Sequence, residues 1–241
     1  MKKLFVLLIT VGALSFLAAQ TNADQKEIVV LLHGLGRGKS IMYPLRDHLR
    51  KEGFSVALVD YHSIGRSPQD ILKDVALQIK SFTSDSAQTV HFVGHSLGGL
   101  LIRAYLDSVT VPHLGRIVLI GSPNGGTPFV DRFRETWWLK MVGPVASSLG
   151  TDAKSFPKTL RRPYYPVGII AGNSSVINNE DLIPGDDDGI VPVESTTVEG
   201  MTDFFLVPVS HSFLPKDEMV MQQTSEFLKH GRFLHERNIV K

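Results

Sequence analysis

The chain has 241 residues, with 25 Lys and Arg, 24 Asp and Glu, and no cysteine. The formal net charge of +1 indicates neither a nucleic-acid-binding protein nor one held to an anionic membrane by its charge. Without cysteine the chain cannot form disulfides, use a thiol nucleophile or bind zinc through sulfur.

The N-terminal residues have the composition of a signal peptide. Lys2 and Lys3 precede an apolar run, and Ala23 ends a stretch of small residues that is typical of a cleavage site. The apolar run is shorter than the roughly 20 residues that a membrane-spanning helix needs. We therefore expect residues 1–23 to be removed and residues 24–241 to be exported as one periplasmic or secreted domain. An anchor that stays uncleaved is the alternative.

Apolar runs rich in β-branched and aromatic residues predict six strands. They cover Ile28–Leu32, Phe54–Asp60, Val90–Val93, Arg116–Ile120, Val167–Ala171 and Phe204–Val209. Between them, Ser67-Pro68 is typical of a helix start, and Gly231 follows the last helical pattern as a stop. Alternating strands and helices predict an α/β fold, with a doubly wound and mainly parallel sheet of about six strands. In such sheets, ligands bind beyond the carboxyl ends of the strands.

The third predicted strand runs into Gly94-His95-Ser96-Leu97-Gly98, and helical spacing follows. This Gly-x-Ser-x-Gly pattern predicts a strained turn with Ser96 at its apex, because the flanking glycines let strand and helix close together. The pentapeptide alone is a weak signal, since a glycine-rich turn without chemistry has the same letters. Its position between a strand and a helix favours a nucleophile.

A serine nucleophile needs a base and a group that orients the base. His211 directly follows the sixth predicted strand, and no other histidine beyond Ser96 does so. In the expected order of serine, acid and histidine, three consecutive aspartates could supply the acid. We favour Asp188, because it precedes the apolar Gly-Ile-Val-Pro segment. We expect Asp186 and Asp187 to face water, and Asp187 is the main alternative.

The oxyanion of an acyl-transfer intermediate needs hydrogen-bond donors, each worth about 3 kcal/mol in the barrier. The N–H of Leu97 is one candidate, because Leu97 begins the helix after Ser96. The N–H of Leu35 is the other, because Gly34 lets the loop after the first strand turn that amide inward. A glycine-rich turn without this role is the alternative for His33–Gly36.

Four motifs together resemble those of α/β-hydrolase lipases and esterases. They are Gly94-His95-Ser96-Leu97-Gly98-Gly99, His33-Gly34-Leu35-Gly36, Ser122-Pro123-Asn124-Gly125-Gly126-Thr127-Pro128 and Asp188-Gly189-Ile190-Val191-Pro192. The nearest branch is the lipase-like group that includes GPI inositol-deacylase-type hydrolases. The resemblance implies a compact α/β-hydrolase fold without the first two strands of larger members. It implies a serine esterase whose triad is Ser96, Asp188 and His211 and whose oxyanion hole is formed by the Leu35 and Leu97 amides.

Residues 129–162 show no strand pattern and are expected to form a short helical insertion near the site, which is a candidate lid. Trp137, Trp138, Met141 and Val142 either line an acyl pocket or pack a crossover helix onto the sheet. Either arrangement gives an apolar mouth, which favours uncharged acyl esters and permits transient contact with a membrane or lipid surface.

We expect an exported carboxylic-ester hydrolase that acts on lipid-like or short-to-medium acyl esters through an acyl-enzyme on Ser96. An acyltransferase with the same intermediate is the alternative, and a catalytically silent binding module is a remote one. The expected partner is a small-molecule or lipid ester and not nucleic acid. We expect no cofactor and no metal, because a calcium loop that includes Glu180 and Asp181 fits no known ligand spacing.

Overall fold

The computed structural model describes residues 27–84, 88–175 and 182–235. The expected signal peptide of residues 1–23 lies outside these ranges, as do Glu180 and Asp181. Within the described ranges, no helix is both long enough and apolar enough to cross a membrane.

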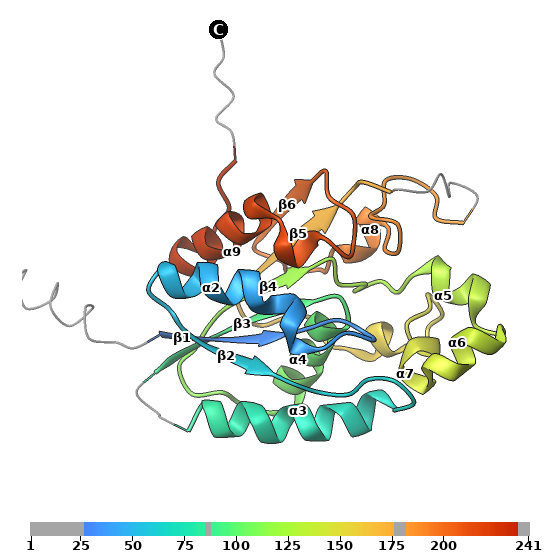
Figure 1. Cartoon of the computed structure of the whole chain (residues 1–241), viewed down its shortest axis with the longest axis horizontal. Helices are drawn as coiled ribbons and strands as arrows, with labels where there is room; N and C mark the ends of the chain where they lie inside the picture. Colours follow the sequence, from blue (N-terminus) through green and yellow to red (C-terminus); the bar gives the residue numbers. More distant parts are fainter. Residues whose placement is uncertain (1–26, 85–87, 176–181, 236–241) are drawn as a thin grey trace, which may run out of the picture.

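Six parallel strands form one sheet in the order β2-β1-β3-β4-β5-β6 (Figure 1). The strands are β1 (Glu27–Leu32), β2 (Ser55–Val59), β3 (Thr89–His95), β4 (Leu114–Ile120), β5 (Val167–Gly172) and β6 (Asp203–Val207). Each overlaps one of the predicted runs, so the predicted α/β fold is confirmed. The strand order reverses between β1 and β3, and the loops that follow these two strands therefore meet at the carboxyl edge of the sheet.

Long helices cover both faces of the sheet (Figure 1). They are α2 (Tyr43–Lys51), α3 (Pro68–Phe82), α4 (Leu97–Ser108) and α9 (Glu218–His230). Successive side chains of a strand point to opposite faces. In β1, Val30 and Leu32 pack with α3 and α4, whereas Val29 and Leu31 pack with α2 and α9. Because both faces are covered, β1 is a continuous apolar run in the sequence.

Short helices lie near the carboxyl ends of the strands, and Figure 1 shows three of them beyond the strand arrowheads. These three are α5 (Pro128–Phe133), α6 (Trp137–Val142) and α7 (Pro144–Ser147), and the 3-10 helix η2 (Phe156–Thr159) follows them. The other short helices are η1 (Lys39–Met42), α8 (Val193–Thr196) and η3 (Leu214–Lys216). Residues 129–162, the predicted insertion, thus contain helical turns and no strand.

Candidate active site

Ser96 lies in a strained turn between β3 and α4. Its φ of 55° and ψ of −121° fall in a region that residues with a side chain rarely adopt. The turn depends on its glycines, because a Cβ on Gly94 would lie 2.4 Å from the main-chain nitrogen of Gly99. A Cβ on Gly98 would lie 2.4 Å from the carbonyl oxygen of Leu32. Strand, turn and helix are thus close-packed through their main chains, as the Gly-x-Ser-x-Gly pattern predicts.

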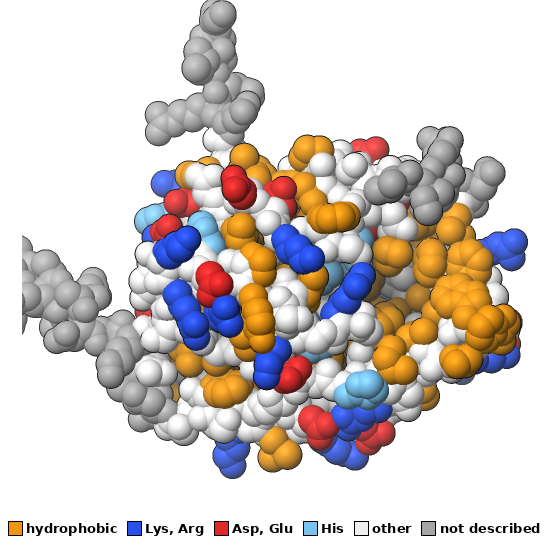
Figure 2. Space-filling model, viewed as in Figure 1, with side chains coloured by type: hydrophobic (Ala, Val, Ile, Leu, Met, Phe, Trp, Pro, Cys, Tyr) orange, Lys and Arg blue, Asp and Glu red, His pale blue; other side chains and the backbone are white. Residues whose placement is uncertain are grey.

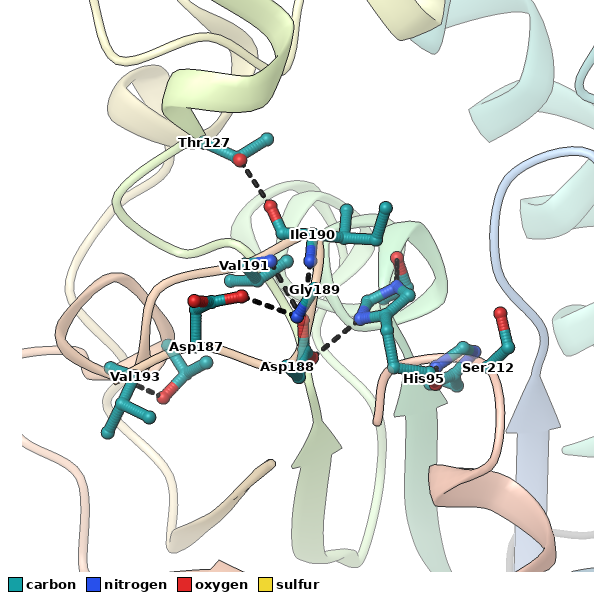
Figure 3. A network of polar contacts seen from close by, with 12 residues as sticks. His95, Thr127, Asp187, Asp188, Gly189, Ile190, Val191, Val193 and Ser212 are labelled. Atoms are coloured by element: carbon teal, nitrogen blue, oxygen red, sulfur yellow. Dashed lines mark hydrogen bonds and ion pairs between the residues drawn. The ribbon is translucent and has the colours of Figure 1, made fainter. Parts of the chain in front are cut away.

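The structure brings Ser96, His211 and Asp188 together in one hydrogen-bonded chain. The Nε2 atom of His211 lies 3.0 Å from Ser96 Oγ, although 115 positions separate the two residues. On the other side of the ring, Nδ1 lies 2.7 Å from Asp188 Oδ2 (Figure 3). Since a carboxylate only accepts, Nδ1 carries the proton and Nε2 is left to accept from the serine hydroxyl.

The structure also distinguishes the three aspartates. Asp188 is 1% exposed, and its second carboxylate oxygen accepts from the main-chain N–H groups of Ile190, at 3.0 Å, and Val191, at 2.8 Å. Asp186 is exposed, as expected. Asp187 is buried, and the expectation that it faces water is wrong, because its Oδ1 accepts from the N–H of Gly189 at 2.6 Å. This bond lies within the turn that carries Asp188, and Figure 3 shows the carboxylate of Asp187 pointing at Gly189.

The loop after β4 anchors the segment that carries Asp188. Thr127 Oγ1 donates to the carbonyl of Ile190 at 2.5 Å, which Figure 3 shows, and the N–H of Gly125 donates to the carbonyl of Ser195 at 2.7 Å. The amide of Asn124 donates to the carbonyl of Thr196 at 2.7 Å. Asn124 therefore serves as a structural tether between the loop after β4 and α8.

The buried guanidinium of Arg103 supports this tether from α4, and sequence reasoning missed it. Arg103 Nη1 donates to Asn124 Oδ1 at 2.8 Å, and Nη2 donates to the carbonyl of Arg161 at 3.0 Å. Burial lowers the pKa of Arg103, which is 3% exposed. An arginine among the apolar residues of α4 is the sequence signal that could have marked Arg103 as a buried charge that needs hydrogen-bond partners.

The two predicted oxyanion donors lie at the ends of adjacent loops. Leu97 is the first residue of α4, where a main-chain N–H has no acceptor within the helix. Leu35 lies with Ser96 on the wall of one cavity, and no hydrogen bond joins its N–H to another described residue. The loop of Leu35 is held in place by its neighbours. The ring of His33 stacks on Tyr61 with centroids 4.1 Å apart, and Gly36 donates to Ser63 Oγ at 2.9 Å.

A cavity of about 250 Å³ opens beside Ser96, and its wall is mostly apolar. From the short helices and the loops around them, the wall includes Phe129, Val130, Trp138, Leu139, Val142, Ala146, Leu149, Ile190 and Val191. Of the four large residues singled out in the sequence, Trp138 and Val142 line the cavity. Trp137 and Met141 are 74% and 69% exposed instead. Figure 2 shows apolar side chains gathered over α5 to α7 on this face.

No three His, Asp or Glu side chains converge in the described ranges as a metal site would need. The site brings together the serine, the imidazole and the carboxylate, the two predicted main-chain donors and the apolar wall.

Several solved structures are similar in fold. The mature lipase BlEst2 of Bacillus licheniformis superposes with a TM-score of 0.73 and 19% identity, over 86% of this chain and 93% of that one. The phospholipase PlaB of Legionella pneumophila gives a TM-score of 0.59 and 17% identity, over 71% and 46% of the two chains. A lipase-esterase related protein of Clostridium acetobutylicum gives a TM-score of 0.55 and 17% identity, over 88% and 96%.

Two comparisons of sequence agree with the fold. Norfluorocurarine synthase 2 of Strychnos nux-vomica is 32% identical over 93 residues, which are 36% of this chain. The match spans only 35% of that relative. A model of the alpha/beta hydrolase family matches residues 29–202, from β1 almost to β6. The chain belongs to the alpha/beta hydrolase family.

Proposed function

We propose that this chain is a serine hydrolase that cleaves carboxylic esters through an acyl-enzyme on Ser96. The observation that carries the proposal is the hydrogen-bonded chain from Ser96 Oγ through the His211 ring to the buried carboxylate of Asp188. Each group in it has the position that its role needs: a hydroxyl at a strained apex, an imidazole that contacts both partners and a buried carboxylate that accepts from the ring.

The reaction proceeds in two halves. Ser96 Oγ attacks the ester carbonyl carbon as its proton passes to His211 Nε2, 3.0 Å away. Asp188 stabilises the imidazolium, and the N–H groups of Leu35 and Leu97 donate to the oxyanion. His211 then returns the proton to the alcohol oxygen as the carbon–oxygen bond breaks. In the second half, His211 takes a proton from water as the water oxygen attacks the acyl carbon, and the collapse of that intermediate releases the acid and restores the Ser96 hydroxyl.

The substrate is an ester with an apolar acyl group. This part of the proposal is supported by the apolar wall of the cavity and by relatives in fold that are named lipase, phospholipase and esterase. The resemblance of the sequence motifs to those of GPI inositol-deacylase-type hydrolases supports lipid-like esters as the narrower class. Trp137, Met141 and Phe213 are exposed apolar residues, each next in the sequence to a residue of the cavity wall, and they support transient contact with a lipid surface.

Export is a further part of the proposal and rests on the sequence of residues 1–23. Expression with the native N-terminus, followed by mass determination of the product outside the cytoplasm, tests it. The expected product begins at Asp24, and a product that keeps Lys2 and Lys3 would contradict it.

Replacement of Ser96 by alanine tests the function. We expect Ser96→Ala to lose hydrolysis of nitrophenyl esters by about a thousandfold or more, with an unchanged circular dichroism spectrum. The wild-type protein should also react with a fluorophosphonate probe and release free acid without an added alcohol. Turnover that persists in the folded variant would refute the mechanism, and acid release that requires an alcohol acceptor would favour the acyltransferase.

A further inference from the structure

His95 occupies a buried position between the two loops of the site, and the mechanism above does not use it. It is the last residue of β3, directly before Ser96, and is 3% exposed. Its ring lies beside the ring of His211, with centroids 4.9 Å apart and planes tilted by 43°. Its Nε2 atom lies 3.0 Å from the main-chain carbonyl oxygen of His211.

The protonation of the His95 ring follows from these contacts. A carbonyl oxygen only accepts, so the Nε2 atom of His95 carries the proton and donates. The Nδ1 atom is then a bare acceptor, which is buried and has no hydrogen-bond partner among the residues that the structure describes. It faces the loop after β1, since a Cβ on Gly34 would lie 3.0 Å from it. Burial, and then the nearby ring of His211, hold the pKa of His95 well below its usual value. His95 is therefore a neutral imidazole with one fixed donor.

The loop that carries His211 needs such an anchor, because His211 lies beyond the end of β6 and outside the ladder of sheet hydrogen bonds. The main-chain N–H of His211 donates to the carbonyl of Asp188 at 2.9 Å, and its carbonyl accepts from His95. Its side chain bonds Asp188 on one side and Ser96 on the other. All four hydrogen bonds of His211 thus come from Asp188 or from the His95–Ser96 pair.

We propose that His95 is a positioning residue, whose Nε2–H holds the carbonyl of His211 and so sets the place of the His211 ring over Ser96. The inference rests on the proposed roles of Ser96 and His211. It adds that the last residue of β3, which directly precedes Ser96, also holds the main chain of His211 in position. Misplacement of a catalytic group by about 1 Å can cost about a hundredfold in rate, so a single main-chain anchor has a measurable effect.

Two variants of similar size test the donor. Glutamine places an amide N–H near the position of the imidazole Nε2, whereas leucine fills the same space without a donor. We expect His95→Leu to lower kcat on a soluble nitrophenyl ester by about 10- to 100-fold, with KM changed by less than about twofold. His95→Gln should recover kcat to within about threefold of the wild type. His95→Met serves as the donor-free variant if the leucine variant does not fold.

The same substitution of His95, made in the His211→Ala variant, shows whether His95 acts through His211. In His211→Ala, adding His95→Leu should change the rate of fluorophosphonate labelling of Ser96 by less than about twofold, because residues that act as a unit are not additive. Equal kcat in the leucine and glutamine variants would overturn the proposal. The proposal would also be overturned if His95→Leu, added to His211→Ala, lowered the rate of labelling by a further factor of about 10 to 100.

Nuclear magnetic resonance separates this proposal from the proposed function. The proton between His211 Nδ1 and Asp188 Oδ2 should give a downfield signal in the wild type and in His95→Gln, and should be lost in His95→Leu. If the wild type neither cleaves esters nor labels, the proposed function fails, but this signal still tests the anchor. A downfield signal that is unchanged in folded His95→Leu would overturn the positioning role.

Discussion

The cavity has two sides that are built differently. On one side, β3 and α4 meet at Ser96 so closely that a single Cβ on Gly94 would lie 2.4 Å from main-chain nitrogen. On the other side, α5 and α6 have six residues each and α7 has four. Trp137 and Met141 of α6 are mostly exposed. The side of Ser96 thus leaves no room for a Cβ at Gly94 or Gly98, whereas the opposite side, which we propose contacts the acyl group, is made of side chains that can be exchanged.

Under the proposed function, this difference predicts that changes in the rate of the reaction and changes in the choice of substrate arise from different residues. The reacting groups are fixed by main-chain packing and by main-chain hydrogen bonds, such as those from Ile190 and Val191 to Asp188. The apolar wall is fixed by contacts between side chains, such as the ring of Trp138 at 5.4 Å from that of Phe133. Substitutions on the first side should act on kcat, and substitutions on the second on the choice of ester.

The largest effect is expected from the acid on the rigid side. Asp188→Asn should lower kcat by about a hundredfold to ten-thousandfold, because an amide in place of the carboxylate favours the wrong tautomer of His211 and no longer stabilises the imidazolium. Steady-state kinetics on a soluble nitrophenyl ester measures this loss.

Asp187→Asn is the matched control, since Asp187 is the adjacent buried aspartate and accepts only from the N–H of Gly189 within the turn. Its amide oxygen can still accept that bond, and kcat should stay within about threefold of the wild type. Losses of equal size in the two variants would show that burial in this loop, and not the contact with His211, determines the effect.

Sequence reasoning was strongest where the signal is local. The six strands and the turn at Ser96 could be predicted, because a buried parallel strand is a continuous apolar run and a tight turn needs glycine at fixed positions. The sequence supports only a preference among the three aspartates, because the assignment depends on which carboxylate accepts a main-chain hydrogen bond within the turn and which one contacts His211. The structure shows that Asp187 makes that bond.

Long-range contacts and short helices were beyond sequence reasoning. The tether from Arg103 through Asn124 joins α4 to two distant loops, and no local pattern reports such a link. In a helix of six residues, the apolar residues Trp137, Trp138, Met141 and Val142 cover most of the circumference, so the pattern cannot separate the cavity side from the solvent side. Only the packing against Phe129 and Phe133 decides that Trp138 faces inward.

This pair of adjacent tryptophans tests the side-chain wall. Trp138→Ala removes cavity wall and leaves space beside Phe133, so we expect kcat/KM on a medium-chain nitrophenyl ester to fall by about tenfold or more. Activity on the acetate ester should fall by less than about threefold, because a short acyl group does not reach that wall. Trp137→Ala, in which the exposed neighbour is removed, should leave the ratio of the two activities unchanged. The same change in both variants would contradict the assignment of the cavity wall.

The rigid side also contains a buried histidine that we expect to affect stability through its titration. His91 of β3 is 1% exposed, and its Nδ1 accepts from the N–H of Arg116 at 3.0 Å. Burial lowers the pKa of His91 to about 4. Between about pH 6.5, where the unfolded chain takes up the proton, and pH 4, the unfolded state binds more protons than the folded state. The free energy of unfolding should therefore fall as pH falls through this window, with His91 contributing up to about 1.4 kcal/mol per pH unit.

His91→Asn keeps an acceptor for the N–H of Arg116 but does not titrate. We expect urea unfolding of this variant to show a smaller loss of stability between pH 6.5 and pH 4 than the wild type. His33 and His95 also have lowered pKa values because of burial, so part of the slope should remain. His230→Asn, at an exposed position on α9, is the control. An unchanged slope in His91→Asn would contradict the assignment.

The smallest effect is expected at the exposed face of α6. If Trp137 and Met141 enter a lipid surface, replacing both by serine removes apolar area that would be buried there and should weaken binding to phosphatidylcholine vesicles by about three- to tenfold. The assay is co-flotation of the protein with vesicles, in the Ser96→Ala background so that no lipid is consumed. Leu77→Ser is the matched control, because Leu77 is 70% exposed but lies on α3 and is not among the residues that line the cavity. Equal weakening in the control would mean that any exposed apolar side chain supports the binding. No weakening in the double variant would restrict the open side of the cavity to esters that arrive from solution.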